Sequence, residues 1–186
     1  MKKLSVGILG FGTVGGGTYE ILTKNHDLIT QRTGVSIDVV KALVRKHREG
    51  IPAHLTTEDP DDILKEPSID VVVETMGGIE PATAFMLQAM ENGKHVVTAN
   101  KAAVAANYEK LQAAAAKNQV QFLFEASVGG GIPVLTSTQN ALQGNAFLEV
   151  VGIVNGTTNY ILTKMTEDGA DYTEVLKDAQ AKGFAE

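Results

Sequence analysis

The sequence KKLSVGILGFGTVGG, at residues 2–16, holds the pattern that decides the fold. Its apolar run predicts a buried parallel strand, and the residues after the glycines are typical of a helix. Gly10 permits a tight turn, Gly12 lets a pyrophosphate approach the backbone, and Gly15 allows close packing of helix against strand. The N–H groups and positive dipole of the helix start favour phosphate. The stretch predicts a dinucleotide-binding turn, the alternative being a glycine-rich turn without a ligand.

Strand-like and helix-like segments alternate from residue 3 to residue 130. The expected strands are residues 4–9, 35–44, 69–75, 95–98 and 121–124; the expected helices are a first one closed by residues 26–34, then 59–64, 80–92 and 102–118. This order predicts an α/β fold, a Rossmann-type doubly wound parallel sheet with helices on both faces. We expect it to form a dinucleotide-binding domain over residues 1–130.

The remaining residues, 131–186, begin within the sequence GGGIP at 129–133, which is the best hinge candidate. We expect a helix at 134–142, a strand at 148–154, and helices at 158–166 and 172–182. These elements predict the start of a second α+β domain that is too small to carry a core of its own.

Composition limits the class of protein. The 186 residues carry a net charge of −6, which argues against nucleic-acid and anionic-membrane surfaces. We expect no membrane span and no signal peptide, because every apolar run is short. The absence of cysteine excludes disulfides and thiolate metal sites, and it fits a cytoplasmic location.

The carboxyl ends of parallel strands form the ligand-binding edge, so residues that follow a strand are candidate cofactor contacts. Thr75 ends the strand expected at 69–75 and Met76 follows it. Arg45 and Lys46 follow the second strand, where an NAD site usually has an acid. A guanidinium binds a 2′-phosphate with paired hydrogen bonds, so we expect NADP, with NAD as the other possibility. The alternative for the two basic residues is a solvated loop.

Two further strand ends carry ionisable side chains. Lys101 lies where a helix begins, a position that disfavours lysine, which favours an anionic ligand or a proton-transfer role for it. The alternative is an ordinary surface lysine in the first turn of a helix. Glu125 precedes a glycine-rich loop, and carboxylate and backbone oxygens together bind hard cations. A helix cap or a buried paired acid is the other interpretation of Glu125. The four histidines lack metal-ligand spacing.

The chain resembles homoserine dehydrogenases over essentially all of its length. The similarity rests on six motifs in the same order: GILGFGTVGGG, VVVETMGG, HVVTANKAA, FEASVGGGIP, VNGTTNYIL and AKGFAE. Each motif alone is modest, but six in this order are specific. The polar loop in VNGTTNYIL, which would also cap a helix, suits a hydroxylated, amino-bearing substrate.

The resemblance implies a reversible NAD(P)-dependent oxidoreductase that interconverts L-homoserine and L-aspartate 4-semialdehyde in threonine, methionine and isoleucine biosynthesis. It implies a homodimer for the full-length protein, with residues 131–186 as part of a substrate and dimerisation domain. It also implies a bound monovalent cation, sodium before others.

The resemblance assigns roles to individual residues. Phe11, Thr13 and Val14 match the pyrophosphate loop, Arg45 matches the 2′-phosphate contact, and Lys101 matches a lysine between cofactor and substrate. The other matched positions are Glu125, Val128, Gly130 and Ile132 for the sodium site, and Gly156, Thr157, Gly183 and Glu186 for the substrate.

One departure from the family is large. A catalytic aspartate and lysine follow the substrate glutamate in the family, whereas this chain stops at Glu186. We therefore expect an intact cofactor domain with a truncated catalytic half, and no turnover by the 186-residue chain itself. Two other hypotheses stay open: an NADP-binding module without turnover, and a different NADP-dependent semialdehyde or imine reductase. The lack of cysteine disfavours a phosphorylating semialdehyde dehydrogenase.

Overall fold

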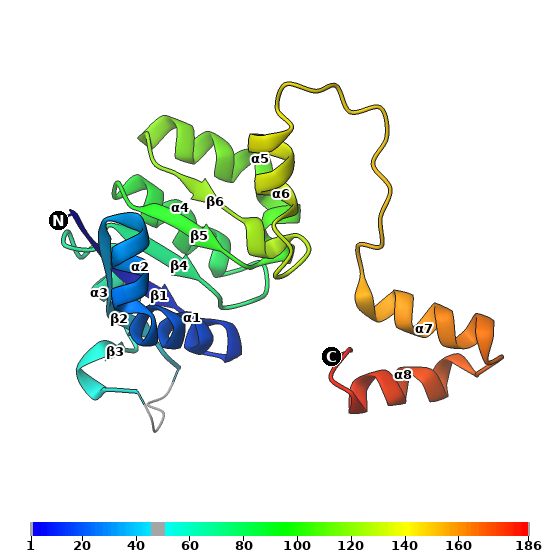
Figure 1. Cartoon of the computed structure of the whole chain (residues 1–186). Helices are drawn as coiled ribbons and strands as arrows, with labels where there is room; N and C mark the ends of the chain where they lie inside the picture. The colour runs from blue at the N-terminus through cyan, green and yellow to red at the C-terminus, as the bar shows by residue number, and fades with distance from the viewer. Residues whose placement is uncertain (1, 46–50, 186) are drawn as a thin grey trace. The chain divides into compact units, whose positions relative to one another are not determined.

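The computed structural model describes residues 2–45 and 51–185, and the chain separates into two compact units, Met1–Thr138 and Gln139–Glu186. A six-stranded parallel sheet forms the centre of the first unit, with strand order β3-β2-β1-β4-β5-β6 (Figure 1). This order is that of a doubly wound dinucleotide-binding sheet, so the predicted Rossmann-type fold is confirmed.

The elements of the first unit match the expected alternation. The strands are β1 (Lys2–Leu9), β2 (Val35–Leu43), β3 (Thr56–Thr57), β4 (Val71–Glu74), β5 (His95–Thr98) and β6 (Phe122–Leu123). The helices are α1 (Thr13–Lys24), α2 (His26–Thr33), η1 (Ala53–Leu55), α3 (Asp61–Leu64), α4 (Ala82–Glu91), α5 (Lys101–Asn118), η2 (Glu125–Ser127) and α6 (Val134–Thr136). Among the described residues, no helix is both long and apolar enough to cross a bilayer.

The core lies on both faces of the sheet. Consecutive residues of a strand point to opposite faces. Leu9 and Val72 therefore join one buried cluster with residues of α3, α4 and α5, whereas Ile8 and Val71 join another with Tyr19 of α1. Burial on both faces explains why these strands are continuous apolar runs in the sequence.

Three local predictions were wrong. Residues 26–34 do not simply close the first helix, because α2 is a separate helix that begins after Asn25, whose backbone leaves the helical region. The helix expected at 134–142 is α-helical only over α6 and continues as a π-helix, η3 (Ser137–Ala141). Residues 148–154 form no strand, because the described residues offer them no hydrogen-bonded neighbour.

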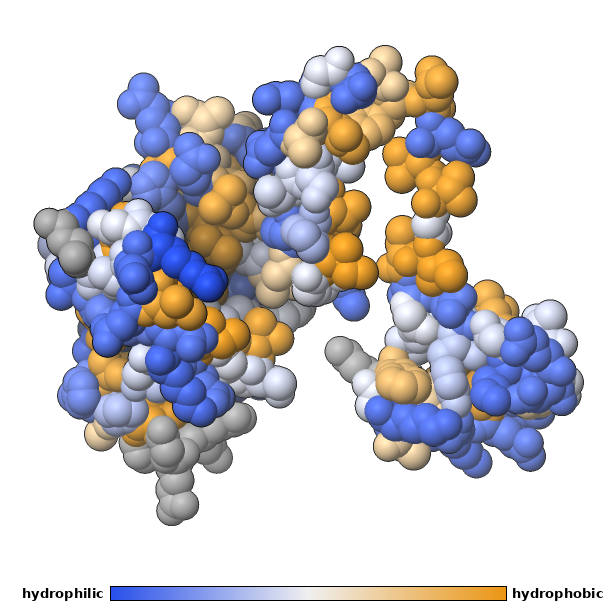
Figure 2. Space-filling view, viewed as in Figure 1, coloured by the Kyte–Doolittle hydropathy of each residue, from blue (hydrophilic) through white to orange (hydrophobic). Residues whose placement is uncertain are grey.

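The second unit contains α7 (Gly156–Glu167) and α8 (Tyr172–Ala181). The side chains of Asn155 and Asp171 cap these helices, and the two pack around a small cluster of Ile161, Val175 and Ala179. The segment that precedes α7 is apolar and exposed, as Figure 2 shows, and the side chain of Leu148 is 99% exposed.

Candidate functional site

Close backbone contacts shape the turn after β1. Gly10 has a φ of +91°, and a Cβ on it would lie 3.0 Å from the backbone of Met76. A Cβ on Gly15 would lie 2.1 Å from the carbonyl oxygen of Gly10, which already accepts a 2.7 Å hydrogen bond from the Thr75 hydroxyl. Packing within the chain therefore requires glycine at both positions.

Gly12 differs because the chain itself does not require glycine there. A Cβ on Gly12 would meet no heavy atom of the described chain within 4 Å beyond its own neighbours. Gly12 directly precedes α1, and no side chain of the described residues caps that helix start. The first N–H groups of α1 are therefore available to a ligand that approaches over Gly12.

A pocket of about 780 Å³ opens beside this turn, at the ends of four strands. Its lining residues are Gly10, Phe11 and Gly12 after β1, Leu43 at the end of β2 with Val44 and Arg45 after it, Glu58 after β3, Thr75 and Met76 after β4, and also Pro60 and Phe85. The strand order reverses between β1 and β4, which is where sheets of this kind bind ligands. Six of the predicted cofactor contacts thus line one pocket.

The other predicted cofactor contacts lie around or beyond this pocket. Thr13, Val14 and Gly15 form the first turn of α1. Lys46 lies outside the described residues. Lys101 is exposed at the first position of α5, and it does not line the pocket.

Glu74 is a polar residue that the sequence reasoning missed. Its side chain is completely buried, and its carboxylate accepts hydrogen bonds from the Met76 N–H (2.7 Å), the Thr98 hydroxyl (2.6 Å) and the Asn100 amide (3.3 Å). The same amide donates a 2.7 Å hydrogen bond to the carbonyl oxygen of Gly78. Glu74 therefore ties the loop after β4 to the residues that precede Lys101.

A signal for the burial of Glu74 was present in the sequence. The motif VVVETMGG places Glu74 two residues after Val72, which lies in the core, and residues two apart share one face of a strand. The acid was therefore on a buried face, where a carboxylate needs hydrogen-bond donors.

Glu125 begins η2, and its carboxylate caps α6. It accepts hydrogen bonds from the Thr136 hydroxyl (2.5 Å), the Thr136 N–H (2.6 Å) and the Leu135 N–H (2.9 Å). These bonds, the hydroxyl first, hold the pKa of Glu125 below its usual value. This arrangement matches the helix-cap interpretation that the sequence left open.

The other three residues of the predicted sodium site lie between Glu125 and α6. They are Val128, Gly130 and Ile132, and the backbone of Gly130 has a φ of +60°. Within residues 2–45 and 51–185, no group of three or more His, Cys, Asp or Glu side chains is arranged to hold a metal ion.

The predicted substrate residues lie in the second unit. Gly156 and Thr157 begin α7, and Gly183, with a φ of +73°, follows α8. The Thr157 hydroxyl donates a hydrogen bond to the carbonyl oxygen of Phe184, so the VNGTTNYIL and AKGFAE motifs lie side by side. Glu186 is outside the described residues.

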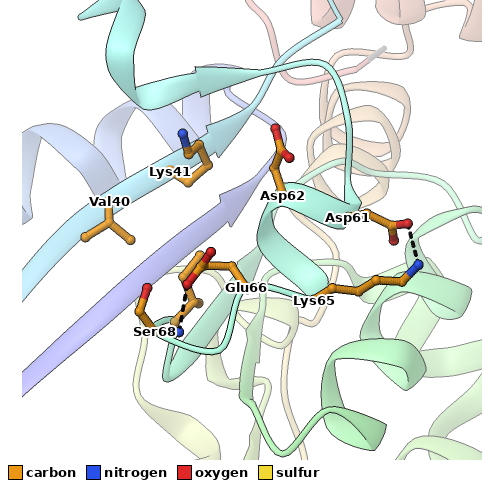
Figure 3. A pocket seen from close by; sticks show the side chains of 8 residues that line it. Val40, Lys41, Asp61, Asp62, Lys65, Glu66 and Ser68 are labelled. Carbon is orange, nitrogen blue, oxygen red and sulfur yellow. Dashed lines mark hydrogen bonds and ion pairs between the residues drawn. The ribbon is translucent and has the colours of Figure 1, made fainter.

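A second pocket, of about 500 Å³, lies beside α3, and Figure 3 shows its side chains. Two of its charged residues, Lys65 and Asp61, pair with each other at 2.6 Å, and Glu66 accepts a 3.0 Å hydrogen bond from the Ser68 N–H. Ser68 precedes β4, at the opposite end of that strand from Met76. This pocket is therefore a polar groove away from the ligand-binding edge.

Comparison with known families matches both parts of the chain. The family model described as "Homoserine dehydrogenase, NAD binding domain" matches residues 10–125, and the one described as "Homoserine dehydrogenase" matches residues 133–186. The homoserine dehydrogenases of Bacillus subtilis and Pseudomonas aeruginosa are 42% and 44% identical to this chain. Both matches cover 100% of this chain but only 44% and 43% of those proteins, so the chain spans less than half of their length.

Solved structures agree. A homoserine dehydrogenase from Thiobacillus denitrificans superposes with a TM-score of 0.92 at 46% identity, covering 100% of this chain and 44% of that one. A hyperthermophilic archaeal homoserine dehydrogenase in complex with NADPH gives a TM-score of 0.78 at 25% identity, covering 98% of this chain and 62% of that one.

Proposed function

Because the chain belongs to the homoserine dehydrogenase family, we propose that its first unit binds NADP and that the whole protein interconverts L-homoserine and L-aspartate 4-semialdehyde. The pocket at the end of β1 carries the cofactor proposal. Gly12 and Arg45 line one cavity there, and no atom of the described chain fills the space over Gly12. The archaeal relative's complex with NADPH supports the same cofactor.

The residues present fit NADP. The N–H groups at the start of α1, with Phe11, Thr13 and Val14, would hold the pyrophosphate. Arg45, with Lys46, would hold the 2′-phosphate. Thr75 and Met76 would line the side of the pocket nearest β4. When bound, the cofactor supplies a nicotinamide ring that accepts or donates hydride.

The substrate's hydroxyl proton needs an acceptor when homoserine is oxidised. Lys101 is our candidate for a residue between cofactor and substrate that handles this proton or holds the substrate. The residues that we propose to bind homoserine are Gly156, Thr157, Gly183 and Glu186. The ammonium group of homoserine would pair with the carboxylate of Glu186.

Several finer features of the proposal rest on the amino-acid sequence, through its residue pattern or its resemblance to the family. They are a monovalent cation, sodium first, at Glu125, Val128, Gly130 and Ile132; a homodimer of the whole protein; a cytoplasmic location; a functional division after residue 130; and a place in threonine, methionine and isoleucine biosynthesis. The cation proposal predicts a higher melting temperature in sodium chloride than in choline chloride at equal ionic strength, and equal values would contradict it.

Calorimetry with NADPH and NADH tests the cofactor assignment. We expect the 186-residue chain to bind NADPH more tightly than NADH, and Arg45→Ala to weaken NADPH binding by about tenfold or more. Arg32→Ala, which removes an exposed arginine that does not line the pocket, is the matched control. Equal affinities for the two cofactors, or an unchanged ratio in Arg45→Ala, would refute the role of Arg45.

Turnover distinguishes the remaining hypotheses. We expect homoserine oxidation by a chain extended to the length of the relatives, and none by the 186-residue chain. Turnover by the shorter chain would show that no later residue is needed. NADPH binding without activity in the extended chain would favour a binding module or a reductase with another substrate.

A further inference from the structure

The cofactor pocket carries a second charged side chain that the proposed function does not use. Glu58 follows β3 and lines the same pocket as Arg45. Within the part of the chain that the structure describes, neither Glu58 nor Arg45 makes a hydrogen bond or an ion pair. Two residues of opposite charge, Glu58 and Arg45, therefore line one cavity without being paired with each other or with another described residue.

Sheet register brings Glu58 to the end of β2. Leu43 of β2 pairs with Thr57 of β3, and the Val44 N–H donates a 2.9 Å hydrogen bond to the Thr57 carbonyl. The next residue of β3's chain, Glu58, thus follows directly beside the residues that lead into Arg45. The end of β2 carries no acid of its own, but the neighbouring strand β3 supplies one to the pocket, Glu58.

The other acids near Glu58 each have a hydrogen-bond or ion-pair partner within the chain. Asp59 accepts a hydrogen bond from the Asp61 N–H (2.9 Å), and Asp62 accepts one from the Thr57 hydroxyl (2.5 Å). Asp61 pairs with Lys65. Of the four acids from residue 58 to residue 62, only Glu58 lines the cofactor pocket.

The two charges favour different cofactors. A carboxylate accepts hydrogen bonds from the free 2′- and 3′-hydroxyls of an adenosine ribose and repels a 2′-phosphate, whereas a guanidinium attracts that phosphate. We propose that Glu58 is a specificity-determining residue through which this pocket accepts NAD(H) as well as NADP(H). This inference rests on the proposed cofactor-binding function of the same pocket.

The test measures dissociation constants of NADPH and NADH for the 186-residue chain and for Glu58→Gln. We expect Glu58→Gln to weaken NADH binding and to strengthen NADPH binding, so that the ratio of the two constants changes by about tenfold in favour of NADPH. Glu58→Lys should move the ratio further in the same direction. Glu91→Gln, an equal change of charge at an exposed residue outside the pocket, should leave it unchanged.

The possible outcomes distinguish a failure of the role of Glu58 from a failure of the proposed cofactor binding. If the unchanged chain binds neither cofactor, the proposed function fails. If it binds NADPH and both Glu58 variants keep the ratio of the Glu91→Gln control, the role of Glu58 is refuted and the cofactor site stands. Equal weakening of NADPH and NADH by Glu58→Gln would also refute it, because a contact to the shared adenine would then explain the result.

Discussion

Apolar, strand-like sequence is buried in a sheet in the first unit of the chain and is exposed without forming a strand in the second. In the first unit, β1 and β4 have neighbours on both sides, and residues such as Ile8 and Val72 are completely buried. In the second, Leu148 and Val154 are almost fully exposed, because no strand of the described residues pairs with their segment. A β pattern in sequence thus becomes a strand only where partners complete the sheet.

The comparison also separates the two halves of the proposed site. The cofactor pocket is built from backbone turns and buried contacts of the first unit. The predicted substrate residues rest on a two-helix unit whose buried cluster contains only Ile161, Val175 and Ala179 among the described residues. We infer that the first unit is the more stable of the two, and the following predictions test this contrast.

The largest effect is expected at Gly15. Gly15→Ala places a Cβ 2.1 Å from the Gly10 carbonyl oxygen, and α1 or β1 must shift to admit it. We expect the free energy of unfolding to fall by about 3 kcal/mol, measured by chemical denaturation. Gly17→Ala is the matched control, since its Cβ meets no described atom within 4 Å apart from its chain neighbours and the backbone of its own helix. Alanine favours a helix, so a small gain is expected.

A smaller loss is expected at Glu74. Glu74→Gln replaces one carboxylate oxygen with an amide NH2 group, which cannot accept a hydrogen bond, so a single oxygen is left to accept from the three donors around it. We expect about 2 kcal/mol of destabilisation by chemical denaturation, and faster amide exchange at Met76 and Gly78. Stability equal to that of the unchanged protein would show that the buried carboxylate is not needed as a hydrogen-bond acceptor.

The smallest effect concerns α7 and α8, and it depends on pH. A hydrogen bond to the Tyr160 hydroxyl (2.7 Å) and the carboxylate of Asp178 (2.9 Å) raise the pKa of Lys182 from 10.5 to about 12. Since the folded-state pKa is the higher one, this stabilisation is complete below pH 10.5 and is lost as the pH rises through about 12.

Nuclear magnetic resonance of the lysine side chains measures that titration. We expect Lys182→Met to abolish the loss of stability that the α7–α8 pair shows as the pH rises through about 12. If Lys182 instead titrates at or below 10.5, its contacts with Tyr160 and Asp178 do not persist in solution.

Much of the first unit was predictable because its signals are local. The glycines of the first turn, the apolar runs of β1 and β4, and Gly93, whose φ of +75° ends α4, each act within a few residues. The ligand-binding edge follows from the strand ends, so the amino-acid sequence alone places Arg45 and Thr75 beside Gly10.

The remainder depends on contacts between distant residues. The strand β3 has only two residues, both threonine, and carries no apolar pattern of its own. Without β3, nothing in the sequence places Glu58 beside the end of β2. Glu74 likewise meets Thr98 and Asn100, which lie more than twenty residues away. The strand predicted at 148–154 does not form for the same reason, because a strand needs a neighbouring strand to pair with.

We expect residues 1–138 alone to form a folded NADP-binding unit. Titration of NADPH into a chain that ends at Thr138, and into the 186-residue chain, tests it most directly. We predict a cooperative unfolding transition for the shorter chain and dissociation constants that agree within about twofold, because all residues that line the pocket are retained. A shorter chain that folds but does not bind NADPH, or that does not fold, would show that the first unit is not an independent NADP-binding domain.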